Sequence, residues 1–162
     1  MSMREALITM AKYNSWMNRK LYRAVQELSD EQRKSDRQLY FKSIHDTLNH
    51  LLVVDRLWLH RLNGGAVQFS SAEQHLYSDF EALVIDRLHT DSKLIELVEA
   101  MTDADLNRPF GYYNTRGQLI EHDTSRVLFH VFNHQTHHRG QITAALSQLG
   151  VDYGVTDLIS ME

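Results

Sequence analysis

Two histidines, His134 and His138, stand four residues apart in a stretch with helical periodicity, residues 126–149. Four residues are just over one helical turn and rise by about 6 Å, so both imidazoles project from one face. With this spacing a single helix can offer two ligands to one divalent metal ion. The same face carries apolar side chains at steps of three and four residues, namely Val127, Val131, Ile142, Ala145 and Leu149. The pattern predicts that the histidine pair faces the protein core.

A metal site of this kind needs at least one more ligand from a facing element. Another helix-like segment, residues 43–62, offers His45, His50 and His60. His50 is the best placed of these, because it lies in the middle of the segment on a largely apolar face.

The other histidines are weaker candidates. His130 shares the face of His134 but lies about 12 Å along the helix from His138, so one ion takes either His130 with His134 or His134 with His138. His137 points away from that pair, toward a surface or a position behind the ligands. The remaining three have no partner at ligand spacing, namely His75, His89 and His122.

Four long segments with helical periodicity position these side chains. They cover residues 3–28, 43–62, 78–101 and 120–149. Ser43 is a good N-cap for the second, Gly64 and Gly65 end it, and the third begins with a capping-box pattern at Ser78 and Glu81. Residues 102–119 contain the only proline and read as an irregular connection. The fold class we expect is all-α, an antiparallel, up-down four-helix bundle with longer links between the middle helices.

Composition limits the function classes. The 162 residues suit one domain, residues 1–162, and 43% apolar residues are typical of a globular chain. A net charge of −4 argues against nucleic-acid binding, and the N-terminal sequence has charges throughout, so we expect no membrane partner and a cytoplasmic location. No cysteine is present, which excludes disulfides, a thiolate nucleophile and a cysteine-based zinc site.

Three strings in the sequence resemble the motifs of the DinB (damage-inducible, YfiT-like) superfamily. They are Tyr13-Asn-Ser-Trp-Met-Asn18, then Ser43-Ile-His-Asp-Thr-Leu-Asn-His50 followed by Asp55 and Trp58, and His130-Val-Phe-Asn-His-Gln-Thr-His-His-Arg-Gly-Gln141. The resemblance covers nearly the whole chain. It implies a four-helix bundle with one divalent metal ion held by three histidines, which carry over as His50, His134 and His138.

Three neutral imidazoles leave coordination positions open, as in catalytic metal sites. Such an ion can activate a bound water or thiol, and the imidazole ligands suit Zn²⁺ or Ni²⁺. The resemblance implies a metal-dependent transferase or hydrolase that acts on a small electrophile or a low-molecular-weight thiol. Two alternatives stay open at this point: a metal-binding protein whose ion is structural, and an interaction protein without a functional metal.

Further side chains are candidates around such a site. Asp46 lies four residues before His50 and is a candidate for orienting a ligand or acting as a base, although a carboxylate at this position also suits the helix N-terminus. Arg139 can bind an anionic substrate, but a surface ion pair is the favoured interpretation. Other ligand-orienting candidates are Asn49, Asn133 and Gln141. Tyr112 and Tyr113, in the irregular link, either overhang the site or cover the core. A homodimer through helix faces, with Trp16 as an anchor, is compatible with this architecture.

Overall fold

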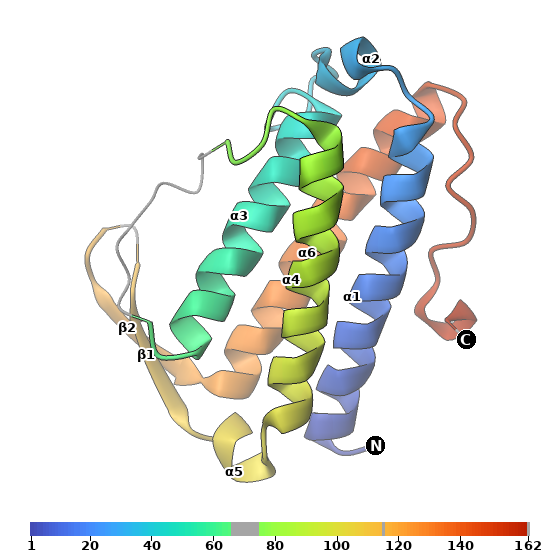
Figure 1. The fold of residues 1–162 in the computed structure, drawn as a ribbon. Coiled ribbons are helices and arrows are strands. Elements are labelled where there is room, and N and C mark those ends of the chain that lie inside the picture. The colour runs from blue at the N-terminus through green and yellow to red at the C-terminus, as the bar shows by residue number, and fades with distance from the viewer. Residues whose placement is uncertain (66–74, 115, 162) are drawn as a thin grey trace.

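Four long helices form the body of the protein in the computed structural model, which describes residues 1–65, 75–114 and 116–161 (Figure 1). They are α1 (Met3–Gln26), α3 (Ile44–Leu62), α4 (Phe80–Ala100) and α6 (Thr124–Gln148). Shorter helical turns are α2 (Asp30–Lys34), α5 (Asp103–Leu106) and a 3-10 turn, η1 (Leu158–Ser160). The predicted four-helix bundle is confirmed.

The helices pack as a ring in which α1 contacts α4 and α6, and α3 contacts the same two helices from the other side. Figure 1 shows that α3 and α4 run in the same direction, opposite to α1 and α6. α3 ends at one end of the bundle and α4 begins at the other, so the long link predicted between the two middle helices connects opposite ends of the bundle. As a result α3 and α6 lie side by side and antiparallel, which is the pairing that the histidine site requires.

Helix starts follow from capping chemistry. The Ser43 hydroxyl accepts a hydrogen bond from the Asp46 amide at 3.0 Å, as predicted for the N-cap of α3. The prediction for the third helix was wrong by one residue, since Asp79 and not Ser78 caps α4, accepting from the Ala82 amide at 2.8 Å. An Asp carboxylate at the N-cap also interacts favourably with the helix dipole, which favours this start.

The region expected to be an irregular link contains regular structure, so that prediction was wrong. After α5 the chain forms an antiparallel hairpin of β1 (Pro109–Tyr113) and β2 (Leu119–Asp123), and α6 begins only at Thr124. Alternate residues of both strands are partly buried, namely Phe110, Tyr112, Ile120 and His122. The strands are five residues each, too short for their two-residue period to stand out in the sequence.

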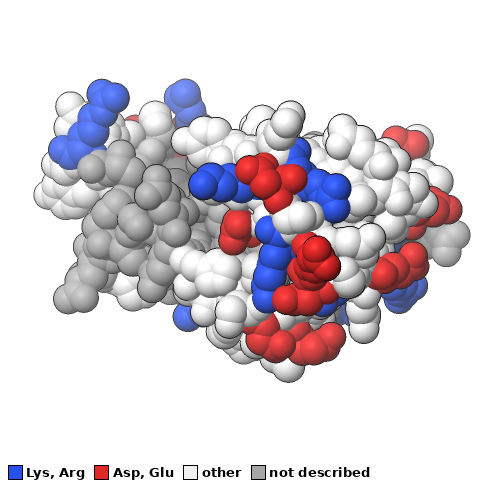
Figure 2. All heavy atoms as spheres, turned by 90° about the horizontal axis from the view of Figure 1, so that it is seen from above, with Lys and Arg blue, Asp and Glu red and all other residues white. Residues whose placement is uncertain are grey.

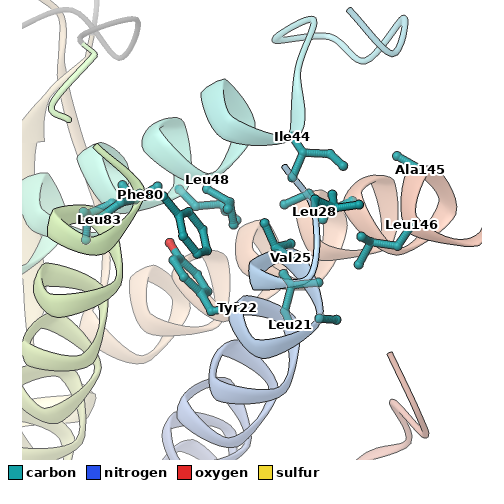
Figure 3. Packing of buried hydrophobic residues seen from close by; sticks show 14 residues of the cluster. Leu21, Tyr22, Val25, Leu28, Ile44, Leu48, Phe80, Leu83, Ala145 and Leu146 are labelled. Carbon is teal, nitrogen blue, oxygen red and sulfur yellow. The ribbon is translucent and has the colours of Figure 1, made fainter. Parts of the chain in front are cut away.

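The largest apolar cluster lies at the end of the bundle where α1 finishes and α3 and α4 begin. Figure 3 shows Tyr22 of α1 against Phe80 of α4, with ring centroids 5.9 Å apart, and Leu48 of α3 beside them. Leu48 and Val25 are fully buried. Close packing of this kind holds the helices in fixed positions relative to one another. It therefore also fixes the distance between the facing side chains of α3 and α6.

The described surface agrees with the charge balance. Figure 2, which views the end of the bundle near α2, shows lysine and arginine side chains interspersed with acidic ones and not gathered into one basic patch. No helix within the described residues is both long enough and apolar enough to cross a membrane.

Candidate metal centre

Three histidines from two facing helices converge at one point. His50 comes from α3 and His134 and His138 come from α6, and one ring nitrogen of each lies within 4.8 Å of the other two. The Nε2 atoms of His50 and His134 are 3.1 Å apart. Within the described ranges this is the only group of three or more His, Asp or Glu side chains that is close enough to share an ion. The structure therefore selects the pairing of His134 with His138 over that with His130.

The spacing of these nitrogens suits a shared metal ion. Two imidazoles on one zinc ion, with Zn–N bonds of about 2.0–2.1 Å, place their nitrogens about 3.3 Å apart at a tetrahedral angle and about 2.9 Å apart at a right angle. The observed 3.1 Å lies between these values. The types and the convergence of the three side chains thus fit the ligand set of one divalent ion.

The environment keeps His134 in the neutral form that a metal ligand requires. Burial, together with the neighbouring imidazoles of His138 and His50, lowers the pKa of His134 to about 3. Its Nδ1 is buried and has no hydrogen-bond partner among the described residues. Burial also lowers the pKa of His138. A neutral imidazole offers one nitrogen lone pair, and this is the form that binds a divalent metal ion.

Gln141 fixes the orientation of the His138 ring. Its Oε1 lies 2.7 Å from Nδ1 of His138, and its Nε2 lies 3.3 Å from Nε2 of His137. The first contact assigns the proton of His138 to Nδ1 and leaves the Nε2 lone pair for the site. Metal-binding histidines commonly have such a partner on the other ring nitrogen.

The other proposed orienting residues have different contacts. The Asn49 side chain receives hydrogen bonds at 3.0 Å from the amides of Leu76 and Tyr77 and donates to the carbonyl of His45, so it anchors the chain before α4. Asn133 is exposed.

The Asp46 carboxylate accepts a hydrogen bond from the Ser43 hydroxyl at 2.6 Å, and its other oxygen lies 3.3 Å from Nδ1 of His75. These contacts belong to the start of α3, as expected of an N-terminal carboxylate.

Phe41 covers the cluster and was not foreseen from the sequence. Its ring stacks on His50 with centroids 3.9 Å apart and lies 5.6 Å from that of His138. The tight turn between Leu39 and Lys42, with a left-handed φ of 67° at Lys42, delivers it there. An aromatic wall excludes water from one side of the ring nitrogens and strengthens the electrostatic interactions at the site. No periodic pattern marks this residue, which is why only the structure reveals it.

Arg139 is not the surface residue that was expected; it is 3% exposed. Its Nη1 donates to the Asn14 side chain and lies 3.4 Å from Oδ1 of Asn18 and 3.3 Å from Oε1 of Gln135. The expectation of a surface ion pair was wrong, because Arg139 lies on the face of α6 that packs against α1. The side-chain oxygens of Asn14 and Asn18 on α1 accept its hydrogen bonds. Arg139 is therefore part of the bundle interior.

A buried charge network continues from that arginine. Arg87 of α4 lies 2.8 Å from Asp55 and 2.7 Å from Asp91, and all three side chains are almost completely buried. The Asn18 amide donates to Asp91, and Gln135 donates to Asp55. Asn14 and Asn18, from the string Tyr13–Asn18 that resembles a family motif, thus link α1 to α4 and α6. The role of the network in this structure is to align α1, α3, α4 and α6.

The two tyrosines of the hairpin lie beside the lower part of α3. Tyr112 packs edge-on against Trp58, with centroids 4.9 Å apart, and Tyr113 is 58% exposed. Trp58 in turn contacts His130 at 5.6 Å, and His130 lies 6.1 Å from His134. The rings of Trp58 and His130 therefore separate Tyr112 from the histidine cluster, and neither tyrosine lies directly over it.

Three other histidines, His45, His89 and His137, occupy ordinary structural or surface positions. Nε2 of His45 lies 2.8 Å from the carbonyl of Tyr77, and His137 and His89 are exposed. Trp16, the suggested dimer anchor, is partly buried and contacts Tyr13 and Lys20 of its own helix.

Comparison with known proteins agrees with this architecture. The family model of the DinB family matches residues 1–162. Protein DinB from Bacillus subtilis (strain 168) is 30% identical over 152 residues, which cover 90% of this chain and 87% of that protein.

Two solved structures are similar in fold. A DinB-like protein from Bacillus cereus ATCC 10987 has a TM-score of 0.68 at 18% identity, over 93% of this chain and 95% of the other. YfiT from Bacillus subtilis, described as a probable metal-dependent hydrolase with an unusual four-helix bundle topology, has a TM-score of 0.71 at 16% identity, over 92% and 89% of the two chains.

Proposed function

This chain belongs to the DinB family, and from that premise we propose that it is a metal-dependent enzyme in which His50, His134 and His138 hold one divalent ion. Zn²⁺ and Ni²⁺ are the metals that this all-imidazole ligand set suits best. The observation that carries the proposal is the convergence of three ring nitrogens within 4.8 Å from two facing helices.

Open coordination positions favour a catalytic ion over a structural one. Structural zinc sites have four protein ligands, whereas catalytic sites have three and keep one position for water or substrate. Among the described residues the group contains three histidines and no carboxylate. When bound, the ion lowers the pKa of a water or thiol and polarises an electrophile.

The protein's own side chains supply the rest of the site. Burial holds His134 neutral, Gln141 holds the proton of His138 on Nδ1, and Phe41 closes one side. Three neutral ligands leave the charge of the ion uncompensated, which favours anionic nucleophiles such as thiolate or hydroxide.

The reaction we propose is attack by a small nucleophile, either a low-molecular-weight thiol or water, on a small electrophilic substrate. The chain has no cysteine, so a nucleophilic sulfur has to come from a second substrate. The description of YfiT as a probable metal-dependent hydrolase supports the water alternative.

Metal content tests the site. Wild type, His134→Ala and His89→Ala are purified without a nickel column, offered Zn²⁺ or Ni²⁺, dialysed and analysed for metal. His89 is an exposed histidine on α4 and serves as the matched control. We expect about one ion per chain in wild type and in His89→Ala and a loss of at least tenfold in affinity in His134→Ala. A folded wild type that takes up neither metal contradicts the proposal.

Chelation then separates a catalytic from a structural ion. Wild type treated with a chelator is compared with the metal-loaded protein by circular dichroism and by activity with a thiol and an alkyl halide, and with an activated ester. A catalytic ion predicts a folded apoprotein whose activity returns with metal. An apoprotein that unfolds, as structural zinc domains do, supports the structural alternative.

A further inference from the structure

Arg61, in the last turn of α3, is a buried cation that has no acidic partner among the residues that the structure describes. It is 6% exposed, and no Asp or Glu oxygen of the described residues lies within 4.0 Å of its guanidinium. The guanidinium lies over the rings of Trp58, at 4.7 Å, and Tyr112, at 5.1 Å. Aromatic faces attract a cation but do not neutralise it. The positive charge therefore stays uncompensated in a poorly solvated place.

The hydrogen bonds of Arg61 are also incomplete. Its Nη2 donates to the carbonyl of Tyr113 at 3.0 Å, but its Nε is buried and has no partner among the described residues. Burial lowers the pKa of this guanidinium, as expected of a charge that lacks a counterion. Buried arginines in folded proteins are normally paired with a carboxylate or a phosphate. The missing partner can therefore be an anion that the protein binds.

A cavity of about 470 Å³ adjoins this arginine between the end of α3 and the hairpin. Its wall includes the aromatic rings of Phe110 and Tyr112 and three residues without side chains, Gly64, Gly65 and Gly111. A Cβ at Gly65 would come within 2.3 Å of the His60 ring, so the local packing leaves no room for a side chain there. Apolar walls with one convergent charged group are typical of small-molecule sites.

A second cavity on the same helix shows why the first is distinctive. It has a volume of about 370 Å³ and is lined by Arg56 and Asp86, among others. There the Arg56 guanidinium lies 2.7 Å from the Asp86 carboxylate and is already neutralised. Of these two cavities, only that at Arg61 has a cation that lacks an acidic partner within the described structure.

A row of rings connects the Arg61 cavity with the histidine cluster. Tyr112, in the cavity wall, contacts Trp58, Trp58 contacts His130, and His130 lies 6.1 Å from His134. Trp58 belongs to α3, His130 and His134 belong to α6, and Tyr112 belongs to β1 of the hairpin, which Figure 1 shows beside one end of α3. Within this row Trp58 is buried, whereas Tyr112 is half-buried and His130 is exposed. An elongated molecule that reaches from Arg61 to the histidines can therefore lie against the rings of Tyr112 and His130.

We propose that Arg61 and its cavity bind the anionic group, a carboxylate or a phosphate, at the remote end of the substrate. The link to a substrate rests on the proposed function; the anion site itself does not. The substrate class is then an elongated small molecule whose reactive end lies at His50, His134 and His138, whose middle packs on aromatic rings and whose far end is negatively charged. Binding energy from such a remote end positions the reactive end at the ion.

Fluorescence tests the anion site without a metal. In a Trp16→Phe background Trp58 is the only tryptophan and reports on the cavity. Benzoate and phenyl phosphate are titrated against benzyl alcohol, which has a similar ring and no charge. We expect one or both anions to bind at least tenfold more tightly than the alcohol, and their ratio distinguishes carboxylate from phosphate. Equal binding of all three probes overturns the proposal.

Variants assign the effect to Arg61. Arg61→Gln should lose the preference for anions, Arg61→Lys should keep part of it, and the control Arg56→Gln should leave it unchanged. Benzyl alcohol reports whether the cavity survives, since Arg61→Gln also removes the bond to Tyr113. A preference for anions that persists in Arg61→Gln, or disappears equally in Arg56→Gln, places the site elsewhere and overturns the proposal.

A final measurement tests the connection to the histidine cluster. Metal-loaded protein is titrated with monohydroxamates of linear dicarboxylic acids of increasing length and with their methyl esters, because hydroxamates bind divalent ions. We expect one chain length to bind best, and that optimum should vanish in the esters and in Arg61→Gln. Affinity that does not depend on length or charge refutes the connection. A protein that holds no metal but still prefers benzoate refutes the proposed function and leaves the anion site standing.

Discussion

Asp55 gives the sharpest prediction, because two large effects on its carboxyl group oppose one another. The side chain is fully buried, which disfavours the ionised form, while Arg87 at 2.8 Å and a hydrogen bond from Gln135 favour it. Arg87 is shared with Asp91 at 2.7 Å, so its charge does not serve Asp55 alone. The balance favours the neutral acid: burial raises the pKa of Asp55 from 3.8 to about 6.

The size and sign of the effect on stability follow from linkage. Each pKa unit corresponds to about 1.36 kcal/mol, so the rise of the Asp55 pKa corresponds to about 3 kcal/mol in the free energy of unfolding. Because the folded state holds this proton more tightly than the unfolded state, wild type loses that amount as the pH rises from about 4 to about 6. The buried histidines act in the opposite sense over similar pH values, so wild type alone does not isolate Asp55.

The comparison with Asp55→Asn isolates it. The amide has the same shape and does not titrate, and the histidines contribute equally to both proteins. Urea unfolding of both apoproteins from pH 4.5 to pH 7 should show the stability of wild type falling relative to the variant as the pH rises, by roughly 2 kcal/mol. A difference that is constant, or that rises with pH, would refute the reasoning and mean that the ion pair with Arg87 outweighs burial.

Three further changes test the site and the frame that holds it. Gln141→Leu removes the hydrogen-bond acceptor of His138 and should weaken metal binding about 10- to 100-fold. Competition with a chromogenic chelator measures the affinity, and an unchanged value means that Gln141 does not orient the ligand. Leu48→Ala in the apolar cluster should lower the free energy of unfolding by about 2–5 kcal/mol in urea, and a loss below 1 kcal/mol contradicts the packing described. Ser43→Ala removes the N-cap of α3 and should cost about 1 kcal/mol by the same assay, with the exposed Ser92→Ala as the control.

Local patterns in the sequence predicted the four long helices and favoured His50, His134 and His138, while the family resemblance implied these three as the ligand set. Helical periodicity is a property of consecutive residues, and an apolar face at steps of three and four is readable without any partner. The spacing of His134 and His138 determines that both rings leave α6 on one side. Capping residues such as Ser43 mark helix starts for the same reason, because the bond closes within three residues.

The hairpin and the role of Arg139 illustrate where such patterns stop. Five-residue strands have too few alternations to be distinguished from a loop. Arg139 reads as a surface charge until the asparagine side chains of α1 are placed against it. An arginine is buried only when a distant part of the chain supplies acceptors, and the sequence near residue 139 does not contain them.

By itself the sequence determined that the protein has long amphipathic helices, that two histidines share one face of the last helix, and that cysteine chemistry is excluded. Only the tertiary structure decided that α3 lies antiparallel to α6 so that His50 meets His134, and that Phe41 covers the cluster. It also decided that Arg61 borders a cavity and has no acidic partner among the described residues. The physical reason is the range of the interactions. Periodicity and capping act over a few residues, whereas a shared ligand site, an aromatic wall and an uncompensated charge depend on side chains brought together from distant segments by the packing of the core.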